Sequence, residues 1–279
     1  MRFQRLSVEK KDLDRAMRKI KVSHEVPLSM MELSRTFNDY DYALVHLFEG
    51  NVKYFGFFKD SLNMGREVIL DNSAFELGES FEMSEYAYWI SKLQPTTYII
   101  PDVLGNAEET LNKLDQWNEF YGHLFKSKKM GVVQGSTVEE VTACYKAMVD
   151  QVDEIAICFH YPFYEQTDMG KMIGRQDLID TWIGEGVIDY SKPHHLLGCS
   201  LPQEFKHYCI GGQRYDFIKS LDTSNPIVHG LEGICYNNEG ELFSKEKIKL
   251  VDLLYAEPSP NFMKVVLSNV EKFKKSLET

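Results

Sequence analysis

Short apolar runs alternate with longer amphipathic stretches along most of the chain. The runs with the length and composition of strands are Val68–Leu70, Tyr98–Ile100, Gly131–Val133, Ile155–Ile157, His195–Leu197 and Phe217–Leu221. Apolar residues with helical spacing follow four of these runs, over Ser84–Leu93, Ala107–Phe120, Thr137–Val149 and from Pro202-Gln203-Glu204 onward. The units recur about every thirty residues, as a parallel barrel requires. We therefore expect one α/β domain with a (β/α)8 TIM-like barrel.

The N-terminal part of the chain has a different pattern. Val8–Lys21 has helical spacing, whereas Tyr42–Phe48 and Val52–Phe58 are rich in residues that favour strands. The turn residues Glu49-Gly50-Asn51 separate these two runs and predict a hairpin. Within a single domain of residues 1–279, we expect a helix and hairpin extension over 1–65, the barrel core over 66–255 and a C-terminal helix over 256–279.

Composition limits the location of the chain and its partners. A net charge of −11 disfavours non-specific binding to nucleic acid. No apolar run approaches the roughly 20 residues that span a membrane, and the charged N-terminus does not resemble a secretory signal. We therefore expect a protein of the cytoplasm, or of the host cytoplasm if it is viral, without a membrane partner.

The cysteines give no sign of a metal site. The chain has 5 cysteines, an odd number with no C-x-x-C pair. His207 and Cys209 are the nearest thing to a ligand pair, and a second pair is missing. We expect no bound metal and no cofactor.

Polar residues that could take part in catalysis or ligand binding follow several of the expected strands. Asp71, Asp102 and Asp222 each come just after an apolar run, and Gln134 follows another. A parallel barrel brings these strand ends to one face, where they can meet a ligand. Each Asp taken alone also fits an Asx turn or a helix N-cap, and Phe75 also fits the core.

Two carboxylates and a planar amide favour displacement at an anomeric carbon. One carboxylate attacks or stabilises an oxocarbenium-like centre, and the other moves the proton. This logic fits glycosidases and also enzymes that exchange nucleobases. The amide of Gln134 and the ring of Phe75 favour a base as the ligand.

Four segments of the chain, in order, are similar to motifs of one enzyme family. They are Asp71–Glu76, Gly131–Ser136, Leu196–Pro202 and Ser220–Pro226. They resemble the motifs Asp-Ser-Gly-Gly-aromatic-Gln, Gly-Ile-Val-Gln-Gly-Gly, Leu-Met-Gly-Val-Gly-x-Pro and Met-Phe-Asp-Cys-Val-x-Pro of the tRNA-guanine transglycosylases and their DNA-modifying relatives. These queuosine-related pentosyltransferases exchange guanine for a 7-deazaguanine base. The resemblance covers roughly residues 66 to 230.

The resemblance implies two catalytic residues. Asp222 corresponds to the nucleophile that attacks C1′ of the sugar and holds it as a covalent intermediate. Asp71 corresponds to the general acid and base that moves the proton between the departing and incoming bases.

The resemblance also implies a base-binding set. Asp102 and Gln134 read the guanine edge, Phe75 stacks on the base and Gly198 gives the backbone room to approach it. Cys158 lies in Ile157-Cys158-Phe159-His160, which replaces a Gly-rich strand end that contacts the base in the family.

Departures from the family favour DNA over tRNA as the substrate. The family's zinc module has no counterpart after Asp222, where Cys235 stands alone, and Ile227-Val228 replace a Thr-Arg pair of the tRNA enzymes. We expect DNA and a 7-deazaguanine base as partners, with a homodimer or a partner subunit left open. The alternatives are the same reaction on tRNA, a hydrolase of nucleosides or modified bases, and a non-catalytic binding subunit.

Overall fold

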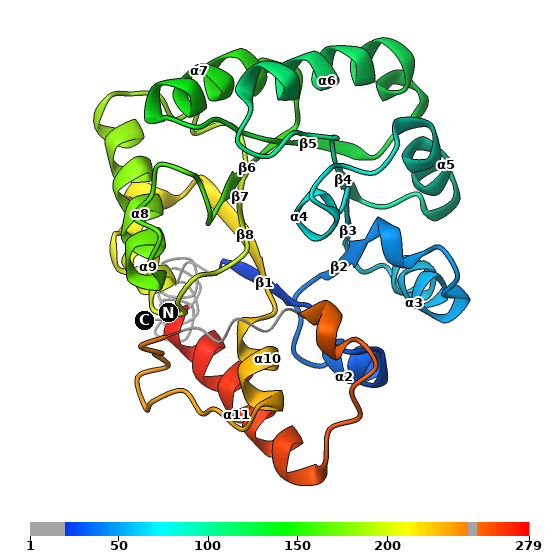
Figure 1. Cartoon of the computed structure of the whole chain (residues 1–279), viewed down its shortest axis with the longest axis vertical. Coiled ribbons are helices and arrows are strands. Elements are labelled where there is room, and N and C mark those ends of the chain that lie inside the picture. Colours follow the sequence, from blue (N-terminus) through cyan, green and yellow to red (C-terminus); the bar gives the residue numbers. More distant parts are fainter. Residues whose placement is uncertain (1–19, 245–249, 279) are drawn as a thin grey trace, which may run out of the picture.

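The centre of the molecule is one sheet of eight parallel strands. The structure is a computed structural model and describes residues 20–244 and 250–278. The strands are β1 (Lys21–His24), β2 (Asp41–Leu44), β3 (Val68–Asp71), β4 (Thr97–Ile99), β5 (Lys128–Val132), β6 (Glu154–Cys158), β7 (His194–Leu197) and β8 (Ile218–Thr223). Their order is β1-β8-β7-β6-β5-β4-β3-β2, and β1 lies beside β2 (Figure 1), so the sheet forms a nearly closed barrel. The predicted (β/α)8 TIM-like architecture is confirmed.

Most helices lie outside the ring of strands (Figure 1). The α-helices are α2 (Met31–Ser34), α3 (Val52–Asn63), α4 (Ala74–Leu77), α5 (Met83–Leu93), α6 (Ala107–Phe120), α7 (Val138–Met148), α8 (Asp168–Gly184), α9 (Glu204–Ile210), α10 (Asn225–Leu231) and α11 (Pro260–Ser276). Short 3-10 turns are η1 (Leu28–Met30), η2 (Val45–Leu47), η3 (Gly122–Leu124), η4 (Val149–Gln151), η5 (Gly212–Tyr215) and η6 (Leu250–Leu253). The expected helices after β3, β4, β5 and β7 are present as α5, α6, α7 and α9.

Polar side chains cap the start of four of the long helices. Asn51, Asn106, Thr137 and Thr167 precede α3, α6, α7 and α8, and the side chain of each accepts a hydrogen bond from a backbone N–H of the first turn. Such a cap satisfies a donor that the helix itself cannot, and contributes typically about 1 kcal/mol. The expected cap of α7, at Ser136 or Thr137, is Thr137.

Apolar side chains fill both the inside and the outside of the barrel. The interior cluster contains Tyr40, Tyr42, Leu44, Ile69, Ile99, Met130, Val132 and Ala156, which alternate with outward residues along their strands. A larger cluster lies between the sheet and the helices and includes the fully buried Trp117 and Trp182. Each fully buried large apolar side chain stabilises the fold by about 1.5–3 kcal/mol. The interior packing stops at the carboxyl ends of the strands, where the polar residues begin.

The residues Asn38 and Asp39, just before β2, bond to β1 in place of a strand ladder. The N–H of Asp39 donates to the carbonyl of Val22 (2.9 Å), and side chains supply the other bonds. In the described part of the chain no ladder pairs these two strands. Asn38 instead accepts from the backbone N–H of His24 (2.8 Å) and donates to its carbonyl (2.9 Å), while the Asp39 carboxylate accepts from the N–H of Val22 (3.0 Å). These bonds satisfy backbone groups that an open edge leaves unpaired.

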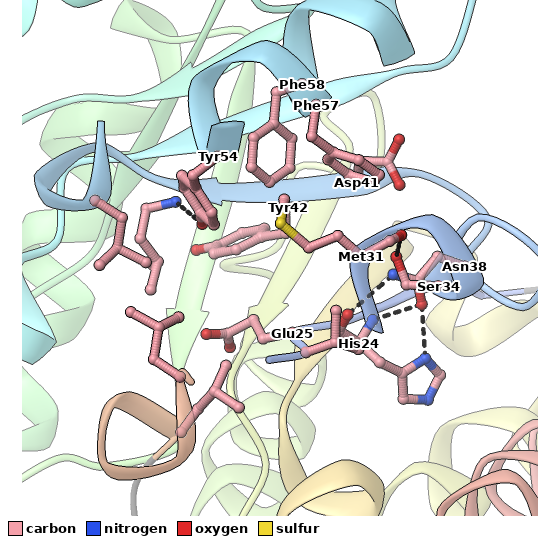
Figure 2. Close-up of a pocket in the computed structure, with 15 residues that line it drawn as sticks. His24, Glu25, Met31, Ser34, Asn38, Asp41, Tyr42, Tyr54, Phe57 and Phe58 are labelled. Atoms are coloured by element: carbon pink, nitrogen blue, oxygen red, sulfur yellow. Dashed lines mark hydrogen bonds between the residues drawn. The ribbon is translucent and has the colours of Figure 1, made fainter. Parts of the chain in front are cut away.

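A small cavity lies along this β1–β2 seam (Figure 2). Its volume is about 30 Å³, which suits one water molecule and is too small for a nucleobase. Figure 2 shows the hydroxyl of Tyr42 and the carboxylate of Glu25 extending to the same side, and the imidazole of His24 pointing the opposite way. Burial lowers the pKa of His24 to about 4. The cavity thus lies where β1 and β2 meet without a ladder.

The expected hairpin is wrong. Of Tyr42–Phe48, only residues 42–44 belong to a strand, β2, and Val52–Asn63 forms the helix α3. The aromatic residues Tyr54, Phe57 and Phe58 occupy one face of that helix and are buried. Helical periodicity and the Asn51 cap therefore outweigh the strand propensity of these residues.

The boundary of the barrel is also corrected. β1 and β2 are strands of the barrel, so it begins at Lys21 and not at residue 66. The expected helix over Val8–Lys21 lies outside the described residues apart from its last two positions, and Lys21 begins β1. Helices α8 and α10 were not expected, whereas α11 falls within the expected C-terminal helix. In the part that the structure describes, no helix is long and apolar enough to cross a membrane.

Candidate active site

Asp71 ends β3 in a tightly constrained turn. One carboxylate oxygen accepts from the Tyr42 hydroxyl and the other from the N–H of Ser73, both at 2.5 Å. Ser73 has a left-handed φ of 61°, a strained conformation for a residue other than glycine. Burial raises the pKa of Asp71 well above its ordinary value, and the charges of Glu76 and Asp222 add to this, while the two hydrogen bonds oppose it. A carboxyl with a raised pKa is suited to carry a proton.

Asp222 lies near the end of β8 with its side chain in the barrel. Its Oδ1 accepts a hydrogen bond from the N–H of Gly198 (3.1 Å) and contacts Nε2 of His195 at 3.0 Å. Nδ1 of the same imidazole lies 2.8 Å from Oγ of Ser220, two residues earlier on β8. Asp222 is 5% exposed. This carboxylate is thus held from two neighbouring strand ends.

Two stacked rings connect the carboxylates of Asp71 and Asp222. The rings of Tyr42 and His195 are nearly parallel, 9° apart, with centroids separated by 6.0 Å. Tyr42 donates to Asp71, and His195 contacts Asp222. Because both rings are buried inside the barrel, the two acids belong to one continuous set of contacts.

Asp102 and Gln134 form a second polar group beside this pair. Asp102 accepts from Asn72 Nδ2 (2.7 Å) and from Gln134 Nε2 (2.6 Å). Gln134 Oε1 accepts from the N–H of Gly105 at 3.0 Å. Burial raises the pKa of Asp102, and the two amide hydrogen bonds oppose this rise. In this conformation the Gln134 amide orients Asp102, and both its hydrogen-bonding groups are engaged within the protein.

The turn after β7 and the aromatic rim are closely packed. Gly198 has a φ of +65°, and a Cβ at this position would lie 2.5 Å from the ring of Phe159. Phe159 in turn contacts Phe75 edge to face, with ring centroids 5.8 Å apart, and Phe75 is 45% exposed. Cys158, at the end of β6, lies 3.8 Å from Gln134 Nε2, and burial raises the pKa of its thiol. Phe75 is therefore available at the surface of the rim.

A buried arginine fixes the strand ends on the other side of the site. Arg175 of α8 donates to the carbonyls of Ile157 (3.2 Å), Leu197 (2.9 Å) and Gly198 (2.9 Å). It also forms two hydrogen bonds with Glu204 of α9, at 2.6 and 3.0 Å. Arg175 thus holds in place the turn whose N–H reaches Asp222.

The sequence-predicted residues gather at the carboxyl end of the barrel. Asp71, Asp102, Gln134, Cys158, Gly198 and Asp222 all stand at or just after strands β3 to β8. Sequence reasoning missed Asn72, Tyr42, Arg175 and the role of His195. A signal exists for Tyr42, which alternates with Tyr40 and Leu44 as an inward strand residue does. The predicted hairpin arm Tyr42–Phe48 hides this signal.

No metal centre is found among the described residues, because no group of three or more His, Cys, Asp or Glu side chains could hold an ion. His207 contacts Asp180 at 3.1 Å and the Tyr215 hydroxyl at 2.8 Å. This imidazole links α8, α9 and η5.

Comparison with protein-family models and with curated proteins finds no match for this chain. The site combines a buried acid whose pKa is raised, Asp71, with a second carboxylate held by directed donors, Asp222. Both lie at the face where TIM barrels carry their active sites.

Proposed function

We propose that this chain is a base-exchange transglycosylase that replaces guanine in DNA with a 7-deazaguanine derivative. The observation that carries the proposal is the pair Asp71 and Asp222, which the stacked rings of Tyr42 and His195 connect at the carboxyl end of the barrel. The two acids have different surroundings, as an acid and a nucleophile require. The motif resemblance supplies the substrate class.

The first displacement releases guanine. A carboxylate oxygen of Asp222 attacks C1′ of the deoxyribose while the C1′–N9 bond breaks and its electron pair passes to N9. Asp71, which is protonated at this stage because of its raised pKa, gives its proton to the departing base. The products are free guanine and a sugar ester of Asp222.

The second displacement inserts the new base. Asp71, now ionised, takes the N9 proton of the incoming base, whose nitrogen attacks C1′ and expels the Asp222 carboxylate. The ester removes the charge of Asp222, which is one of the charges that raise the pKa of Asp71. Asp71 therefore becomes a weaker base when the ester forms, and its remaining neighbour Glu76 helps to keep its pKa high enough for it to accept the proton.

The neighbouring polar group reads the base. Asp102 accepts from N1 and the exocyclic amine of guanine, with Gln134 orienting it or turning to meet O6. Phe75 stacks on the base from the rim. Cys158 closes the strand end where the related motif has glycine. In a duplex the target base has to leave the stack, so we propose a flipped or single-stranded substrate.

The test is exchange of labelled guanine into a guanine-containing single-stranded oligodeoxynucleotide. Wild-type protein should incorporate label and show a covalent adduct by intact mass. Asp222→Asn should do neither, whereas Asp150→Asn, which changes an exposed carboxylate away from the strand ends, should behave as wild type. Wild-type rates in Asp222→Asn would refute the mechanism. Parallel reactions with duplex DNA and tRNA identify the polymer.

Hydrolysis of free nucleosides is a second candidate. The net charge of −11 favours it, since a polyanionic substrate is repelled by such a chain. Release of guanine from 2′-deoxyguanosine without any polymer would favour this reaction over base exchange.

A further inference from the structure

The two oxygens of Asp222 have unequal surroundings. Oδ1 lies within hydrogen-bond distance of His195 Nε2 (3.0 Å) and of the Gly198 N–H (3.1 Å). In the described ranges no hydrogen bond to Oδ2 is found. One oxygen is therefore fixed by the protein, and the other remains for the substrate.

The contacts of His195 determine which ring nitrogen carries the proton. An ionised carboxylate only accepts hydrogen bonds, so Nε2 of His195 has to donate to Asp222. The other nitrogen, Nδ1, lies 2.8 Å from the hydroxyl of Ser220. The imidazole is 1% exposed, and the nearly parallel ring of Tyr42 lies with its centroid 6.0 Å away. With the proton on Nε2, the bare Nδ1 of the ring is an acceptor for the Ser220 hydroxyl.

We propose that Ser220 and His195 are positioning residues for the nucleophile. Asp222 keeps the proton of His195 on Nε2, and the Ser220 hydroxyl donates to the bare Nδ1 and so fixes the position of the ring. His195 together with the Gly198 N–H then holds Oδ1, so that Oδ2 of Asp222 is the attacking atom. This role rests on the proposed transglycosylase reaction and adds to it the atom that attacks and the residues that select it.

The same two donors serve both halves of the reaction. When the Oδ2–C1′ bond forms and the C1′–N9 bond breaks, Oδ1 becomes the carbonyl oxygen of the ester and keeps both donors. When the incoming N9 attacks C1′, the electron pair of the Oδ2–C1′ bond returns to Asp222, and the donors stabilise the carboxylate as its charge develops.

The tautomer can be measured without substrate. In protein labelled with ¹⁵N-histidine, long-range proton–nitrogen correlation distinguishes a protonated ring nitrogen from a bare one, and His195→Phe identifies the signals of His195. Wild-type protein should show Nε2 protonated and Nδ1 bare. Ser220→Ala should shift the signal of the bare Nδ1, which loses its hydroxyl donor, and Ser220→Thr should restore it. Protonated Nδ1 in the wild type, or an unchanged Nδ1 signal in Ser220→Ala, would overturn the proposal.

Adduct formation with the single-stranded oligodeoxynucleotide gives the kinetic test. Ser220→Ala should slow the step about tenfold at saturating substrate with KM unchanged, and His195→Phe should slow it by about 10²–10³, as for loss of one preorganised donor. Ser34→Ala is the matched control, since among the described residues this buried hydroxyl bonds only the carbonyl of Met31. A wild-type rate in Ser220→Ala contradicts the positioning role. If wild-type protein forms no adduct, the transglycosylase proposal fails, while the spectrum still decides the tautomer.

Discussion

Arg175 and Glu204 form a fully buried ion pair with two hydrogen bonds, 2.6 and 3.0 Å long, behind the ends of β6 and β7. We predict that Arg175→Met lowers the free energy of unfolding by about 3–5 kcal/mol, because it leaves the Glu204 carboxylate buried without its partner. The double variant Arg175→Met/Glu204→Leu should recover much of this loss. Urea denaturation measures both variants, and a double variant as unstable as the single one would contradict the explanation.

The double variant also distinguishes the effect of Arg175 on the stability of the fold from its effect on the position of the Gly198 turn. It removes the donors to the carbonyls of Leu197 and Gly198 while the fold is retained. We expect its base-exchange kcat to fall more than its KM rises, since the Gly198 N–H is then less well directed at Asp222.

Asp71→Asn should lower the base-exchange activity and raise the stability of the fold. Burial raises the pKa of Asp71 above its ordinary value of 3.8, so the folded state binds the proton more tightly than the unfolded state. Stability therefore falls as the pH rises from about 3.8 towards the raised pKa, and the penalty persists above it. The neutral amide avoids this penalty, so the variant should melt higher than wild type near pH 8, with a difference that shrinks towards pH 3. Differential scanning calorimetry across pH tests this, and equal melting temperatures at every pH would argue against a raised pKa.

Tyr42→Phe should shift the pH dependence of base exchange. The hydroxyl of Tyr42 donates to Asp71 and opposes the rise of its pKa. Without it the pKa rises further, so the decline of kcat/KM at alkaline pH should begin at a higher pH, while the ring still covers His195. Tyr98→Phe is the control, because that hydroxyl bonds Trp117 outside the barrel interior. If the pH profile of kcat/KM in Tyr42→Phe equals that of wild type, Tyr42 does not influence the proton transfer by Asp71.

Gly198→Ala should damage the site through both sterics and backbone strain. The added Cβ would meet the ring of Phe159 at 2.5 Å, and a φ of +65° costs a residue with a side chain about 1–2 kcal/mol. Gly198→Ala/Phe159→Leu should relieve the clash and keep the strain. We expect thermal unfolding to recover only in part in the double variant, and full recovery would assign the whole cost to the clash.

Local sequence pattern predicts much of this fold. From Val68 onward a short apolar run marks the position of most strands, and capping residues such as Asn106 and Thr137 precede the helices that follow. The same approach fails for residues 41–63. Their aromatic residues favour strands locally, but in α3 such residues form the buried face of a helix. There tertiary packing decides between two periodicities that the short runs do not distinguish.

The site is foreseeable only where it depends on strand ends. Asp71, Asp102 and Asp222 stand out because they follow apolar runs, and the structure gathers them at one end of the barrel. The stacking of Tyr42 on His195 joins residues 153 positions apart across the barrel interior. No local sequence pattern predicts such a contact, since it depends on how the whole sheet closes into a barrel.

The Asn38 and Asp39 contacts along the β1–β2 seam have a consequence for how the protein behaves in solution. A barrel whose first and last strands are not paired has two strand edges. Another chain can add a strand to either edge and start an aggregate. Here the amide of Asn38 and the carboxylate of Asp39 occupy the N–H groups of His24 and Val22. The barrel therefore has no strand ladder between β1 and β2, close to its candidate active site. The occupied N–H groups nevertheless prevent that edge of β1 from pairing with a strand of another chain.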